Sequence, residues 1–266
     1  ITKFLFIFVV FIVFILLFRL GSWILTKFLT PSKSPIILKG MTNGRNYIKI
    51  NVNPTKKDPK PIFRSINQNQ GLEFTWSTWL FVENVFSDSN DKYQRVFAKG
   101  GDEDINHEMT VGGLTVNNQL INVTPGLFLE SNTNKLVFVM NTYDESLESS
   151  DVEMPYEIIE VENIPIQKWV CCTIRVQNKT VDVYVNGILT KRVNMNKIPK
   201  QNYGNIHVGG HSDGFNGYVS SLRYFDHAVG NGKIQDILQA GPNLKIIGSE
   251  MTDTNPPYLS MKWYLQ

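Results

Sequence analysis

A stretch of alternating residues, WVCCTIRVQNKTVDVYVNG at positions 169–187, constrains the fold more strongly than any other part of the chain. Apolar and polar residues alternate over 169–176 and again over 181–185, and a period of two is typical of half-buried β-strands. The polar residues 177–179 between these runs predict a turn, and Asn186-Gly187 predicts the next one. We therefore expect a β-hairpin whose second strand turns one set of side chains inward: Val181, Val183 and Val185.

Four further segments follow the same strand-like pattern. They are FTWSTWLF at 74–81, VFAKG at 96–100, GLFLESNTNKLVFVM at 126–140 and GNIHVGGHSDGFNGYVSSLRYF at 204–225. Together with the hairpin, and in this order, they resemble the laminin G-like domains of the concanavalin A-like jelly-roll superfamily over residues 71–241. The resemblance implies an all-β fold, an antiparallel concanavalin A-like sandwich with Trp76 or Trp79 facing the interior. It implies a fold and not an activity.

The N-terminal region is apolar over a membrane-sized length. Residues 4–18 contain only Phe, Leu, Ile and Val, and the apolar character continues past Arg19 to Leu29. This length is enough to cross about 30 Å of hydrocarbon if Arg19 extends towards the head groups. We interpret residues 1–30 as a transmembrane helix that enters the lipid bilayer through residues 4–29. The alternative is a cleavable signal peptide, although the run is longer than a typical signal and no small-residue cleavage site follows.

The segment 31–70 is rich in Pro, Asn and basic residues, and its prolines disfavour long regular elements. We interpret it as an extended tether, which at about 3.3 Å per residue would reach on the order of 100 Å. The basic residues that accompany or follow the apolar run are Lys27, Lys33, Lys39, Arg45, Lys49, Lys56, Lys57, Lys60 and Arg64. By the positive-inside rule they place the C-terminal domain on the cytosolic side. These lysines either contact anionic lipid or belong to an ordinary solvated linker.

The predicted organisation is a transmembrane helix at 1–30, a tether at 31–70, a sandwich at 71–245 and a C-terminal tail at 246–266. The net charge of +2 gives no electrostatic footprint for nucleic acid. The two cysteines, Cys171 and Cys172, are neighbours in a predicted strand, so they point to opposite faces and do not pair with each other. A sandwich without disulfides indicates assembly in a reducing compartment.

The superfamily includes glycoside hydrolases, which need two carboxylates flanking the sugar bond. The related glucanases carry them as Glu-x-Asp-x-x-Glu on one strand, and no predicted strand of this chain has that spacing. We therefore expect no enzyme activity, no catalytic residue and no cofactor. Some family members bind calcium at the rim of the sandwich, where oxygen ligands gather. The candidates are Asp102, Glu103, Asp104 and Asp213, and a solvated acidic loop is the alternative.

The remaining polar motifs favour structural interpretations. No histidine lies at zinc-like spacing with the cysteines, and His207 alternates with apolar neighbours as an outward-facing strand residue would. Asn122 and Asn178 begin glycosylation sequons. We interpret both as turn asparagines, since a cytosolic domain would leave them unmodified.

The tail at 255–264, NPPYLSMKWY, resembles the C-terminal ending of laminin G-like proteins encoded by large icosahedral DNA viruses that have an internal membrane. This resemblance implies a virion structural protein. The expected function is a non-catalytic, membrane-anchored minor capsid component that tethers the internal membrane to the outer shell. Its partners would be the lipid bilayer and capsid or other structural proteins, with no nucleic acid. The alternative is a membrane-anchored carbohydrate- or protein-binding module of a cell surface.

Overall fold

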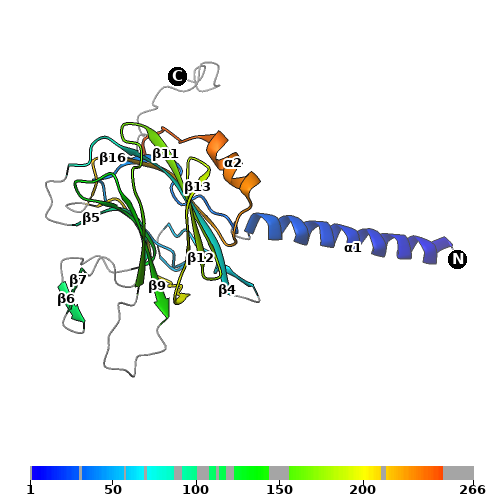
Figure 1. Cartoon of the computed structure of the whole chain (residues 1–266). Helices are drawn as coiled ribbons and strands as arrows, with labels where there is room; N and C mark the ends of the chain where they lie inside the picture. The colour runs from blue at the N-terminus through cyan, green and yellow to red at the C-terminus, as the bar shows by residue number, and fades with distance from the viewer. Residues whose placement is uncertain are drawn as a thin grey trace, which may run out of the picture. The chain divides into compact units, whose positions relative to one another are not determined.

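The computed structural model of the chain describes residues 2–29, 32–56, 58–68, 71–86, 92–100, 108–111, 114–117, 123–143, 156–210 and 214–247. The chain divides into two compact units, Ile1–Lys33 and Ser34–Gln266. The first unit contains a single helix, and the second contains all the strands and a short second helix (Figure 1).

Helix α1 spans Thr2–Leu29. Its segment Lys3–Lys27 is 25 residues long and is apolar enough to cross a membrane. At about 1.5 Å per residue this segment is roughly 38 Å long, which exceeds the hydrocarbon thickness. Apolar side chains occupy every face of the helix and remain exposed, from Phe4 at 80% to Leu25 at 59%. A helix of a water-soluble domain would present an apolar stripe on one face only, so α1 is a candidate membrane span.

Two antiparallel sheets form the second unit. The first sheet has the strand order β1 (Met41–Asn43), β16 (Gly217–Phe225), β4 (Gly71–Val82), β11 (Trp169–Gln177), β12 (Thr180–Val185) and β13 (Ile188–Asn194), with β3 (Ile66–Gln68) beside β4. The second has the order β10 (Tyr156–Val161), β9 (Leu136–Tyr143), β8 (Val123–Glu130), β5 (Tyr93–Gly100), β15 (Ile206–Val208) and β2 (Ile48–Ile50), with β14 (Ile198–Pro199) beside β9. Strands β6 (Glu108–Val111) and β7 (Leu114–Asn117) pair only with each other among the described strands.

The hairpin predicted at 169–187 is confirmed as β11 and β12, and it lies in the middle of the first sheet. Ile174 stands opposite Val183 in the register. The turn between the strands contains Asn178 at φ 58°, a left-handed conformation that asparagine tolerates. Val181 and Val183 are buried in the main core, and Val185 packs against it. The period of two therefore predicted the correct inward face.

The core lies between the two sheets. Trp76 of the first sheet stacks on Phe97 of the second, with ring centroids 5.2 Å apart. Trp79 belongs to the opposite face of the first sheet, so Trp76 is the interior tryptophan. Cys172 is buried in the core, whereas Cys171 lies on the outer face within 4.0 Å of the Thr173 hydroxyl. Both cysteines are free thiols, as their positions on opposite faces predicted.

Helix α2 (Asn231–Ala240) covers part of the outer face of the first sheet. Ile234 of the helix packs in a small apolar cluster with Tyr184 and Phe225. Beside this cluster, Asp182 accepts hydrogen bonds from two arginines. The Asp182 carboxylate lies 2.6 Å from Nη2 of Arg175 and 2.5 Å from Nε of Arg192. The side chain of Asp182 is only 4% exposed, so the two arginines take the place of the water that hydrates the carboxylate in the unfolded chain.

The structure does not support an extended tether over residues 31–70. Within that range β1 pairs with β16, β2 pairs with β15, and β3 pairs with β4. Ile37 and Leu38 are buried in the main core. Three-residue strands are too short to show a period, so the sequence did not reveal that this segment completes both sheets. The predicted tail boundary also shifts, because Ile246 forms a bridge with Met41 and Ile247 donates its N–H to the Met41 carbonyl at 3.0 Å.

Candidate functional site

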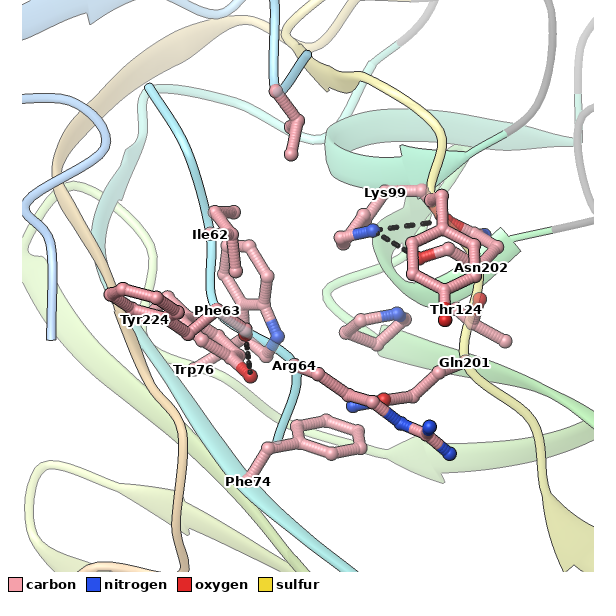
Figure 2. Close-up of a pocket in the computed structure, with 13 residues that line it drawn as sticks. Ile62, Phe63, Arg64, Phe74, Trp76, Lys99, Thr124, Gln201, Asn202 and Tyr224 are labelled. Carbon is pink, nitrogen blue, oxygen red and sulfur yellow. Dashed lines mark hydrogen bonds between the residues drawn. The ribbon is translucent and has the colours of Figure 1, made fainter. Parts of the chain in front are cut away.

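A pocket opens at one end of the sandwich, between the two sheets and the segment 62–64 (Figure 2). Its aromatic wall comes from the first sheet, where Trp76 and Tyr224 lie with ring centroids 5.0 Å apart. The Tyr224 hydroxyl donates a hydrogen bond to the Phe63 carbonyl at 3.1 Å, which fixes the segment against the sheet. The opposite wall is polar and includes Lys99 and Asn202.

Lys99 is the most unusual group of the pocket. Its side chain leaves β5, and its ammonium donates to the Asn202 carbonyl at 2.5 Å and to Asn202 Oδ1 at 3.1 Å. The Asn202 Nδ2 donates back to the Lys99 carbonyl at 2.9 Å. Burial lowers the pKa of Lys99 to about 8. These neutral oxygen acceptors hold the ammonium in place, and the contacts together fix the 200–205 loop against β5.

The size of this pocket limits what can enter it. Its cavity of about 50 Å³ is well below the roughly 300 Å³ at which sites for small organic molecules begin. The hydroxyl of Thr124 on its wall is buried and has no hydrogen-bond partner among the described residues. A polar cavity with such a group suits ordered water. In this conformation the pocket accepts water or a small polar group, and a sugar ring does not fit.

The lowered pKa of Lys99 predicts a pH dependence of stability. Between about pH 8 and the unfolded lysine pKa near 10.4, the unfolded chain binds the proton that the folded chain has released. Stability therefore rises with pH over this window, by about 3 kcal/mol from this group. We expect urea denaturation of Lys99→Met to lack this rise relative to the parent chain. Parallel pH profiles of parent and variant would contradict the burial of the ammonium.

The calcium candidates Asp102, Glu103, Asp104 and Asp213 lie outside the described residues, so the calcium site remains a prediction. Among the residues that the structure describes, no group of three or more His, Cys, Asp or Glu side chains is arranged to hold a metal ion.

The carboxylates that are buried in the described part of the chain have structural partners. Asp182 is paired with two arginines, Glu73 accepts a hydrogen bond from Gln177 Nε2 at 3.3 Å, and Asp226 Oδ1 lies 2.9 Å from Nδ1 of His227. These contacts give each of the three carboxylates a structural role.

The prediction that His207 lies on the outward face of its strand is confirmed, because Ile206 and Val208 belong to the main core and His207 does not. The side chain is nevertheless only 2% exposed. Its Nδ1 lies 2.7 Å from the hydroxyl of Tyr47, and the two rings are stacked. Tyr47 belongs to the segment interpreted as a tether, so nothing in the sequence indicates that this face is covered. His107 and His211 lie outside the described residues.

Sequence reasoning also missed Lys99 and its loop. Alternation places Lys99 on a strand, but it does not show that the chain returns about 100 residues later to cover the ammonium. The one local signal that points to a buried polar contact is a lysine directly after the apolar run Val96-Phe97-Ala98.

Comparison with known proteins identifies the class to which this sandwich belongs. A laminin G-like model, described as the concanavalin A-like lectin/glucanases superfamily, matches residues 61–235. The match covers more than half of the chain, which therefore belongs to this superfamily. No curated protein matches the chain.

Similar solved structures include binding domains of botulinum neurotoxins. The serotype D ligand binding domain in complex with N-acetylneuraminic acid has a TM-score of 0.50 and 11% identity, and the match covers 78% of this chain and 45% of that one. The binding domain of neurotoxin DC in complex with rat synaptotagmin II has a TM-score of 0.44 and 14% identity, with 64% and 36% coverage. The chain thus matches less than half of each of these domains. At such identities the likeness shows the fold alone.

Proposed function

We propose that the protein is a membrane-anchored, non-catalytic binding protein that holds a jelly roll next to a bilayer. One observation carries this proposal: a fully exposed apolar helix of membrane-spanning length precedes a complete sandwich in the same chain. The helix supplies attachment, and the rigid sheets hold the loops that contact a partner.

The connection between the two units is short. Helix α1 ends at Leu29, and the first residue buried in the core is Ile37. The eight residue steps between them span at most about 28 Å when fully extended. The domain is therefore restrained close to the bilayer if α1 spans it. This short connection takes the place of the extended segment 31–70 expected from the sequence, which would have reached on the order of 100 Å. A partner protein must therefore approach a domain that lies near the membrane.

The specific role that we propose is that of a minor capsid component, linking an internal virion membrane to the outer shell. The tail resemblance at 255–264 supports it, as does the excess of basic residues after α1, which by the positive-inside rule favours a cytosolic position of the domain during assembly. The two free thiols also suit a reducing compartment.

The cell-surface alternative requires an accessible glycan site, and the described sequon suits it poorly. Asn178 occupies a tight turn in a left-handed conformation, and its side-chain oxygen is buried. A Cβ atom at Gly71 would lie 3.4 Å from that oxygen, which shows how closely the two segments pack. This geometry favours a structural turn asparagine.

Crosslinking of the full chain in its native membrane, followed by mass spectrometry, tests the proposal. We expect lysine crosslinks from the jelly roll to a structural shell protein, and an unmodified Asn178 peptide. Micromolar binding to a glycan array, together with a glycan on Asn178, would instead identify an extracellular lectin and overturn the virion role.

A further inference from the structure

A second cavity lies at the edge of the sandwich, away from the Lys99 pocket. Its volume is about 270 Å³, near the lower end of the range for small-molecule sites. Two chain segments form one wall, and backbone hydrogen bonds hold them together. Met41 donates to the Lys245 carbonyl at 2.7 Å, and Ile247 donates to the Met41 carbonyl at 3.0 Å. Asn243 Nδ2 also donates to the Lys39 carbonyl, so the wall is preformed.

Three lysines line this cavity: Lys39, Lys60 and Lys245. Its lining includes no acidic residue among those that the structure describes, and none of the three lysines forms an ion pair with a described carboxylate. Three positive charges that have no counter-charge among the described residues repel one another and attract an anion. The cavity therefore has the electrostatic character of an anion site.

Lys60 shows the effect of burial and of a neighbouring positive charge. Its ammonium is half-buried and donates to the Ile37 carbonyl at 2.6 Å. Burial, followed by the charge of Lys39, lowers the pKa of Lys60. A bound anion would oppose both effects by stabilising the protonated amine.

The rest of the lining is aliphatic. Ile37 and Ile50 are buried at the base, whereas Ile246 and Ile247 are 57% and 43% exposed. An inorganic anion would leave these side chains in water, but a ligand with an alkyl part would cover them, at about 25 cal/mol per Å² of apolar surface buried. The lining thus combines the chemistry of a phosphate site with that of an acyl-chain site.

We propose that this cavity binds an anionic glycerophospholipid, with the phosphate among the three lysines and the upper acyl chain against the isoleucines. The choice of a lipid rests on the proposed membrane anchorage. Ile37 and Lys39 follow the end of α1 by only eight and ten residues, so the chain holds this cavity within reach of the bilayer surface. Lipid bound here would orient the jelly roll on the membrane.

Titration of the full chain in a non-ionic detergent tests the proposal. The probes are dihexanoyl phosphatidic acid, dihexanoyl phosphatidylcholine and inorganic phosphate, with binding followed by calorimetry. We expect phosphatidic acid to bind at least tenfold more tightly than either of the others. In the double variant Lys39→Gln/Lys245→Gln this affinity should fall by about tenfold or more. Both lysines are exposed, so the variant should keep the parent's melting temperature.

The matched control removes the same charge elsewhere, in the double variant Lys168→Gln/Lys191→Gln at exposed positions outside the cavity. It should bind phosphatidic acid as the parent does. If both double variants lose the same affinity for phosphatidic acid, the attraction is non-specific and the proposal is wrong. If inorganic phosphate binds as tightly as phosphatidic acid, the cavity is a simple anion site and not a lipid site. The proposal is also wrong if phosphatidylcholine binds as tightly as phosphatidic acid, or if phosphatidic acid does not bind. Because these probes are soluble and the protein is in detergent, the result does not depend on whether α1 spans a membrane.

Discussion

Replacing Val183 with aspartate is expected to destabilise the jelly roll by several kcal/mol. Val183 is 1% exposed, stands opposite Ile174 in the central hairpin and belongs to the main core. An aspartate there loses its hydration and gains no partner, which costs several kcal/mol. Since a domain of this kind is stable by roughly 5–15 kcal/mol in total, the change removes a large part of the folding free energy. Urea denaturation in detergent, followed by the fluorescence of core residue Trp76 and the other tryptophans, measures the loss.

The same chemical change at Ile188 provides the control. Ile188 is also β-branched and lies next to Val185 across the β12–β13 turn, but it is 71% exposed. Ile188→Asp should therefore change the free energy of unfolding by less than about 1 kcal/mol. If Val183→Asp unfolds at the urea concentration of the parent, the assignment of the inward face of the hairpin is wrong.

Replacing Asp182 with asparagine is expected to destabilise the domain by about 3 kcal/mol. The change removes the charge that compensates Arg175, whose side chain is only 15% exposed, while Arg192 at 57% remains solvated. Asp236→Asn is the matched control. Asp236 is 67% exposed and pairs with Lys233 at 3.6 Å on α2, so its loss should change stability by less than about 0.5 kcal/mol.

The pH dependence of stability provides a second test of the Asp182 ion pairs. Burial by itself would raise the pKa of Asp182, but the hydrogen bonds from Arg192 and Arg175 and their charges outweigh it, so the pKa lies below the usual value. The contribution of this group is therefore fully present above the unfolded aspartate pKa of about 3.9 and is lost as the pH falls below it. Asp182→Asn should lose less stability than the parent between pH 5 and pH 3. If parent and variant lose the same free energy of unfolding between pH 5 and pH 3, the ion pairs of Asp182 do not stabilise the domain.

The sequence predicted those elements whose signal is local. The β11–β12 hairpin follows from its own alternation and turn residues, and the long apolar run of α1 needs no tertiary information. The strands β1 and β2 have three residues each and pair with β16 and β15, more than 150 residues away in the chain. Strands this short leave no alternation of apolar and polar residues in the sequence, so the composition of the segment 31–70 predicts a tether instead.

The candidate sites were less accessible to prediction for a related reason. Alternation assigns His207 to a face of the sheet, but only the fold shows that Tyr47 covers that face. The Lys99 pocket and the three-lysine cavity each combine segments from opposite ends of the domain. In the sequence Lys39 and Lys60 belong to the basic segment 31–70, whereas Lys245 stands at the end of the predicted sandwich. Only the folded chain brings these three charges together beside a group of isoleucines.

Alkaline extraction of membranes that contain the full chain tests whether α1 anchors the jelly roll in a bilayer, with the intact mass of the protein measured in the pellet and in the supernatant. We expect the protein to stay in the pellet until detergent is added, with residues 1–33 still attached, whereas a chain that begins at Ser34 should appear in the supernatant. Release of the protein into the supernatant without detergent, with the apolar segment removed by cleavage, would show that α1 is a signal sequence and not an anchor.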